Sequence, residues 1–124
     1  MTSPTSDLAS LLSTLTSYRA EKEAIYNKKL DTVDLTLAGI DREKRKLRKE
    51  RTRVERELDD VEAGIRLAQD SAIPVVFLAE QTELQNKLNE LDLTLARLAR
   101  KWKELKKEKK AIERAWSCAG PLAF

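Results

Sequence analysis

Lysine and arginine side chains are the residues of this chain whose type and spacing best suit a chemical task. Residues 42–56 carry nine cations against three carboxylates, and residues 93–124 again carry nine against three. Closely spaced cations bind the phosphates of a nucleic acid or an acidic protein surface. The sequence therefore predicts a basic docking surface. Its members are Arg42, Arg45, Lys46, Arg48, Lys49, Arg53, Arg56, Arg97, Arg100, Lys101, Lys103, Lys106 and Lys107.

The chain lacks the side chains that catalysis and metal binding need. The chain has no histidine and one cysteine, Cys118, so it offers neither an acid–base triad nor a zinc ligand set. Its three glycines are too far apart for a phosphate-binding loop. We therefore expect no catalytic residue, no cofactor, no metal and no small-molecule substrate, and we do not interpret the protein as an enzyme.

The overall composition is typical of long helices. Of the 124 residues, 36% are charged and 5% are aromatic, and the formal net charge is only +3. In compact globular domains about a quarter of the residues are charged. The longest apolar run, residues 73–79, is far shorter than the roughly 20 residues that span a bilayer. We expect no membrane association and a cytoplasmic or nuclear protein, since residues 44–49 have the composition of a nuclear import signal and no signal peptide is evident.

Proline and glycine mark the ends of two predicted helices. Ser6 is a candidate N-cap, so residues 1–6 are expected to be a disordered lead and the first helix to cover about 7–72. Pro74 disfavours a helical residue before it and suits the first turn of a new helix. The second helix is expected to cover about 75–117, with an apolar tail over 118–124 that contains a Gly-Pro stop signal.

Each predicted helix carries a narrow stripe of apolar residues, which we call the seam. Its members recur at alternating steps of three and four, the repeat of a coiled coil. In the first helix the seam is Val33, Leu37, Ile40, Lys44, Leu47, Arg51, Val54, Leu58, Val61, Ile65, Ala68 and Ala72. In the second it is Leu84, Leu88, Leu91, Leu95, Leu98, Trp102, Leu105, Lys109, Ile112 and Trp116.

A turn at Pro74 allows the two seams to pack against each other. The register we expect places Ile65 opposite Leu84 at one end and Val33 opposite Trp116 at the other. The sequence thus predicts an all-α fold, an antiparallel coiled-coil helical hairpin over residues 33–117, because a short connection favours antiparallel neighbours.

Two cations interrupt the first seam. In the expected register Lys44 lies opposite Leu105 and Arg51 lies opposite Leu98. Charged seam residues commonly fix register at a cost in stability. Leucine at both positions is therefore expected to raise the melting temperature.

The sequence is also compatible with a second architecture. A corner at Gly39 gives a three-helix bundle of residues 7–38, 41–72 and 75–117. The seam continues through Gly39 without a cluster of turn residues, which favours the hairpin.

Residues 7–32 form a helical overhang beyond the expected hairpin. An apolar helix face without a partner in its own chain usually marks an interaction site. Three interpretations are open: pairing with a second copy, docking on another protein, or a frayed and disordered segment. The predicted interface consists of Leu8, Leu11, Leu12, Leu15, Tyr18, Ile25, Tyr26 and Leu30.

These features lead to one functional hypothesis and one alternative. We expect a non-catalytic coiled-coil adaptor or structural subunit, a scaffold whose partner is a protein or a second copy in a homo-dimer, with the basic surface as a secondary docking site. The alternative is a nucleic-acid-binding arm that grips the phosphate backbone through residues 42–56 and 97–110.

Overall fold

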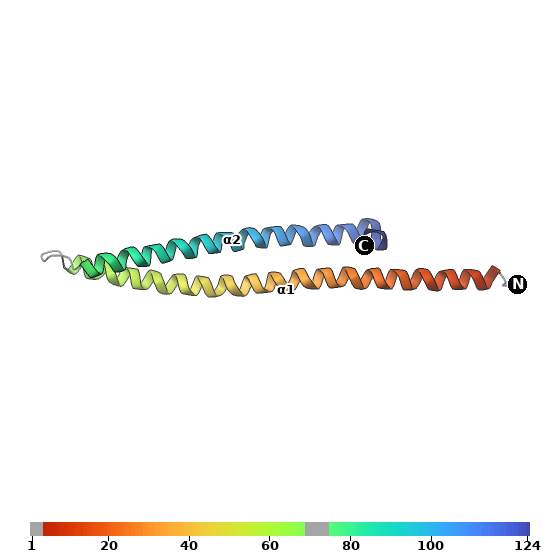
Figure 1. Cartoon of the computed structure of the whole chain (residues 1–124), viewed down its shortest axis with the longest axis horizontal. Coiled ribbons are helices and arrows are strands. Elements are labelled where there is room, and N and C mark those ends of the chain that lie inside the picture. The colour runs from red at the N-terminus through yellow and green to blue at the C-terminus, as the bar shows by residue number, and fades with distance from the viewer. Residues whose placement is uncertain (1–3, 69–74) are drawn as a thin grey trace. The chain divides into compact units, whose positions relative to one another are not determined.

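The protein is an all-α helical hairpin in which two long helices pack against each other, as Figure 1 shows. The computed structural model describes residues 4–68 and 75–124. Helix α1 covers Pro4–Leu67, α2 covers Val75–Ala119, and a short 3₁₀ helix, η1, covers Gly120–Ala123. The described residues contain no strand, and the predicted fold class is confirmed.

Helix α1 begins and ends earlier than the sequence predicted. It starts at Pro4. The expected N-cap at Ser6 is therefore wrong, as is the disordered lead for residues 4–6. Proline suits the first turn of a helix because its missing N–H has no partner there in any case. Helix α1 ends at Leu67 rather than near residue 72, and the turn predicted at Pro74 lies outside the described residues.

Gly39 lies inside one continuous helix, so the three-helix alternative is wrong. A single glycine weakens a helix by roughly 1 kcal/mol relative to alanine, which is too little to break a helix that packs along its seam. At the end of α2, Gly120 has φ +56 and ends the helix in the left-handed conformation that favours glycine. Helix α2 thus stops two residues beyond its predicted end.

The chain divides into two compact units. The central unit is Ala38–Trp102, and the terminal unit combines Met1–Leu37 with Lys103–Phe124. In the central unit four buried side chains, Val54, Leu58, Leu84 and Leu88, form the core, with Val61 and Leu91 packed against it. Full burial of one such side chain contributes roughly 1.5–3 kcal/mol. In the terminal unit Val33 and Leu37 of α1 are buried.

The observed contacts displace the predicted register by one heptad. Tyr26, seven residues before Val33, is the residue that stacks on Trp116. Arg51 pairs with Asp92, so its predicted position opposite Leu98 is wrong. The same shift of one heptad moves Lys44 away from its predicted position opposite Leu105. Because the seam repeats every seven residues, both registers place seam against seam, and the apolar pattern alone cannot distinguish them.

Candidate interaction surfaces

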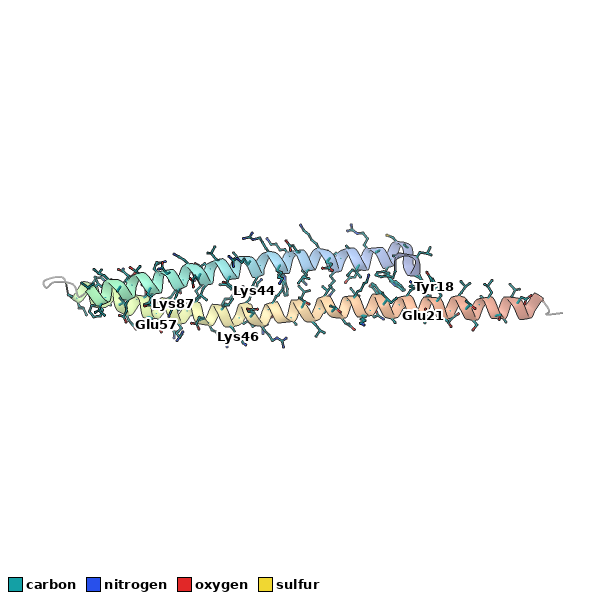
Figure 2. The ribbon with its side chains drawn as sticks, in the orientation of Figure 1. Tyr18, Glu21, Lys44, Lys46, Glu57 and Lys87 are labelled. Carbon is teal, nitrogen blue, oxygen red and sulfur yellow. The ribbon has the colours of Figure 1, made fainter. Side chains whose placement is uncertain are left out.

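The first five residues of the predicted interface form an exposed apolar face on α1. We call Leu8, Leu11, Leu12, Leu15 and Tyr18 the N-terminal apolar face. The exposed fractions of its leucines lie between 53% and 64%, and Tyr18 is 40% exposed. Within the terminal unit this part of α1 extends past η1 (Figure 1), and every residue from 7 to 21 is exposed. Figure 2 shows Tyr18 near the end of the packed part of this unit.

Four of the five members of the N-terminal apolar face do not continue the seam. The seam of the terminal unit passes through Val33, Leu30 and Tyr26, and the same steps of three and four toward the N-terminus reach three polar residues, Glu23, Arg19 and Thr16, before they reach Leu12. Leu8, Leu11, Leu15 and Tyr18 are set one residue earlier, which rotates them by about 100° around the helix axis. These four side chains therefore point in a different direction from the seam that packs on α2.

The last three residues of the predicted interface belong to the packed hairpin. Tyr26 and Leu30 are half-buried, and Tyr26 stacks on Trp116 with ring centroids 4.8 Å apart. Ile25 is 40% exposed and lines a groove between α1 and α2. The displaced register explains this difference, because it moves the end of α2 toward the N-terminus of α1.

An aromatic cluster of Tyr26, Trp116 and Phe124 packs the end of the chain and the end of α2 against α1 in the terminal unit. The turn of η1 places the Phe124 ring edge-on to Tyr26, with the ring centroids 5.7 Å apart, and 5.9 Å from Trp116. Lys22 donates a hydrogen bond to the carbonyl oxygen of Phe124, and the ammonium of Lys29 lies 5.0 Å from the centre of its ring. The sequence predicted only an apolar tail for Phe124. The available signal for the cluster was Tyr26, which lies one heptad before Val33.

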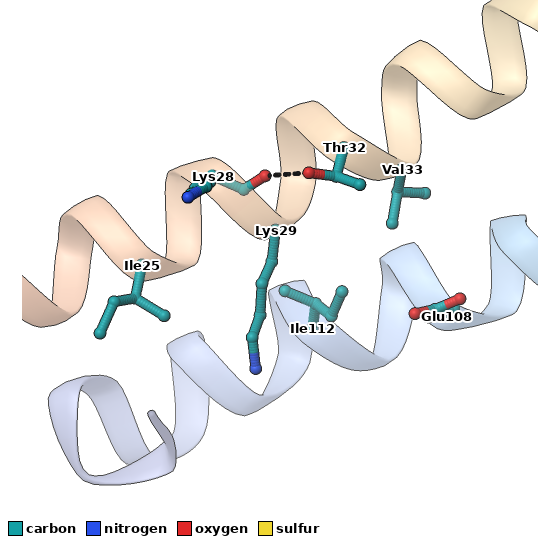
Figure 3. Close-up of a pocket in the computed structure, with 7 residues that line it drawn as sticks. All are labelled: Ile25, Lys28, Lys29, Thr32, Val33, Glu108 and Ile112. Carbon is teal, nitrogen blue, oxygen red and sulfur yellow. Dashed lines mark hydrogen bonds between the residues drawn. The ribbon is translucent and has the colours of Figure 1, made fainter.

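The groove beside the aromatic cluster is shallow and open, with a volume of about 550 Å³ (Figure 3). Ile25, Val33 and Ile112 line it with apolar side chains, and Lys28, Lys29, Thr32 and Glu108 complete the lining. Figure 3 shows Lys29 extending from α1 toward α2. The hydroxyl of Thr32 donates to the carbonyl of Lys28, 2.8 Å away, so it offers no free donor to a ligand. The groove thus lacks the convergent polar groups that small-molecule sites use.

All thirteen members of the predicted basic surface are exposed. Ten of them belong to the central unit, where the contact of Lys44 with Trp102 sets the neighbouring cations of α1 close to Arg100 and Lys101. Lys103, Lys106 and Lys107 belong to the terminal unit.

Few of these exposed cations are neutralised within the chain. Arg45 pairs with Asp41 at 2.8 Å, and Arg53 pairs with Glu50 at 2.5 Å, which raises the pKa of Arg53. In the described part of the chain several others form no ion pair, namely Arg42, Lys46, Arg48, Lys49, Arg56, Arg97, Arg100 and Lys101.

The cations of the seam all find partners on the opposite helix. Arg51 donates to Asp92 at 2.6 Å and also to Glu55, and the hydrogen bond to Asp92 is the main cause of its raised pKa. The ammonium of Lys44 lies 5.3 Å from the centre of the Trp102 ring. In the terminal unit Lys109 pairs with Asp34 at 2.8 Å, and this hydrogen bond raises the pKa of Lys109. These three contacts tie the helices together in the observed register.

Over the described residues no group of histidine, cysteine, aspartate or glutamate side chains is arranged to hold a metal ion. The thiol of Cys118 is exposed. None of the described helices is long and apolar enough to cross a membrane. Comparison of the chain with known protein families, with curated proteins and with solved structures finds no match.

Proposed function

We propose that this protein is a non-catalytic adaptor or structural subunit that assembles through its N-terminal apolar face. The observation that carries the proposal is this face itself, four leucines and a tyrosine exposed on one stretch of a regular helix. An exposed apolar patch of this kind costs free energy in water, and a partner helix removes that cost.

A second copy of the same chain is the occupant that this face favours. Leu8, Leu11, Leu15 and Tyr18 are separated by steps of three, four and three, which read the same in both directions. Two copies can therefore pair antiparallel, with Leu8 opposite Tyr18 and Leu11 opposite Leu15.

The charge and hydrogen bonding of the segment agree with self-pairing. Between residues 7 and 18 the only charged side chain is Asp7, so two copies meet with little repulsion. The hydroxyls of Thr14 and Thr16 donate within the helix, to the carbonyls of Ser10 and Leu12 at 3.0 and 2.8 Å. These hydroxyls can be covered by a partner without losing a hydrogen bond.

The test is the molar mass of the full chain, measured by light scattering over a dilution series. We expect a dimer, and we expect Leu11→Glu with Leu15→Glu to weaken it more than about 1,000-fold, because four buried leucines are lost per dimer. Circular dichroism checks that the helices persist. The matched control is Leu35→Glu with Leu93→Glu, two exposed leucines elsewhere in the chain.

Two results count against the proposal. A full chain that is monomeric at every concentration shows that the face does not bind its own copy. Equal loss of the dimer in the control variant shows that association runs through other surfaces.

A further inference from the structure

The outer side of α1 in the central unit carries a line of cations. Arg42, Lys46, Lys49, Arg53 and Arg56 follow one another at steps of four and three, and all five are exposed. We call this line the basic stripe. Figure 2 labels Lys46 on the outer side of α1 in this part of the helix.

The seam fixes where the basic stripe points. Each of its members comes two residues after a seam residue, as Arg42 comes after Ile40 and Arg56 after Val54. Two residues rotate an α-helix by about 200°, so the stripe lies almost opposite the seam that packs on α2. The fold of the central unit therefore does not use these side chains, and they remain available to a partner.

The fold also leaves most of the stripe's charge unpaired. Arg42, Lys46, Lys49 and Arg56 form no ion pair within the described residues, and only Arg53 is held by carboxylates, Glu50 and Glu57. The 14 steps from Arg42 to Arg56 extend the stripe over about 21 Å, with a cation every 5–6 Å on average. The four unpaired charges repel one another unless an anion of similar length lies along them.

Helix α2 carries the same kind of line within the terminal unit. Lys103 and Lys107 lie two residues before and after Leu105, and Lys110 and Arg114 flank Ile112 in the same way. All four are exposed, and the described residues give them no ion pair. The spacing on α1 is thus repeated on the second helix.

We propose that the basic stripe is a binding site for the phosphate backbone of a nucleic acid duplex. No apolar or aromatic side chain lies within the stripe, whereas the centre of a protein–protein interface is apolar and poor in charge. Protein–DNA interfaces are much more positively charged, and backbone contacts need only cations in line. Contacts to phosphates carry no sequence information, so we expect the binding to be independent of sequence. This site is separate from the N-terminal apolar face and does not depend on the proposed function.

The test is fluorescence anisotropy of the full chain with a labelled 20-base-pair DNA duplex over 50–200 mM salt. The four unpaired cations of the stripe neutralise four phosphates, which predicts a log–log slope near −3.6 and about a 150-fold loss of affinity over this range. Lys46→Gln with Lys49→Gln removes two contacts, so the slope falls to about −1.8, a loss of about 12-fold. The side chains point into solvent, and the variant should therefore keep the melting temperature of the parent.

The matched control is Lys28→Gln with Arg66→Gln, which removes the same charge from two exposed cations of α1 outside the stripe. It should keep the slope near −3.6. Absence of duplex binding at 50 mM salt overturns the proposal, as does an equal fall of the slope in the control. Binding of polyglutamate in place of the duplex overturns it too, and assigns the stripe to an acidic protein.

Discussion

At the scale of single residues, Arg51 shows how a charge in the seam is accommodated. Its guanidinium donates to Asp92 on α2 and to Glu55 on its own helix, so one cation holds two carboxylates close together. Without Arg51 these carboxylates repel each other. The prediction from sequence that leucine at Lys44 and Arg51 raises the melting temperature stays untested. The structure gives the two side chains different partners, carboxylates for Arg51 and the Trp102 ring for Lys44.

We predict that the effect of Asp92→Asn changes sign with the residue at position 51. In the parent chain Asp92→Asn lowers the melting temperature because it removes the partner of Arg51. In an Arg51→Leu chain it raises the melting temperature because it removes a repulsion from Glu55. Thermal unfolding of the four variants of this cycle measures the coupling, and additive effects would show that the contact is not formed.

Lys109 gives a prediction on pH. Its pair with Asp34 raises its pKa in the folded chain, so the pair stabilises the fold below the unfolded pKa of about 10.4 and the contribution is lost as the pH rises through the folded value. Unfolding in urea at pH 8 and pH 11 should show a loss of stability that Lys109→Met reduces. An identical loss in Lys109→Met excludes this pair as a source of the pH dependence.

At the scale of the helices, the end of α2 depends on Phe124. The ring covers Tyr26 and Trp116, and an aromatic pair contributes about 0.5–1.5 kcal/mol beyond its buried area. We predict that Phe124→Ala shifts tryptophan emission to the red and lowers the melting temperature. Leu122→Ala is the control, since Leu122 is 84% exposed and should change neither.

Gly39 is a position at which a substitution is expected to stabilise the protein. A Cβ at this position meets nothing within 4 Å, and the residue lies inside a continuous helix. Gly39→Ala should therefore stabilise the protein by about 0.5–1 kcal/mol, measured by urea unfolding. Destabilisation by this substitution would show that α1 is not a regular helix at this point.

The sequence was sufficient for the hairpin and insufficient for its register. Apolar residues at steps of three and four identify a seam, Pro74 separates the two predicted helices, and Gly120 marks the end of the second. A shift by one heptad leaves every seam residue opposite a seam residue, so the pattern could not choose between registers. That choice is visible only in particular contacts, such as Tyr26 on Trp116 and Arg51 with Asp92.

The same shift divides the predicted interface. Residues 8–18 are exposed as expected, whereas Tyr26 and Leu30 pack inside the terminal unit. A signal for this division was present in the sequence, because the apolar phase changes by one residue between Tyr18 and Tyr26. The basic surface was recognised from composition, but its division into paired cations and an unpaired stripe required the ion pairs of the structure.

At the scale of the whole molecule, the chain separates two kinds of surface along its sequence. Residues 7–18 carry the N-terminal apolar face and are almost uncharged, and residues 42–56 are strongly basic. The N-terminal apolar face belongs to the terminal unit and the basic stripe to the central unit. The proposed assembly and the proposed phosphate binding therefore involve different side chains.

Disulfide formation across the apolar face is the most direct measurement of this arrangement. Leu11→Cys and Leu15→Cys chains, each with Cys118→Ser, are oxidised alone and as an equal mixture. Antiparallel pairing predicts rapid cross-linking in the mixture, slow cross-linking in either chain alone, and none between Leu35→Cys and Leu93→Cys chains. Cross-linking of the mixture no faster than that of the Leu35 and Leu93 controls would show that the N-terminal apolar faces do not pair, and faster cross-linking of each chain with itself would show a parallel pair.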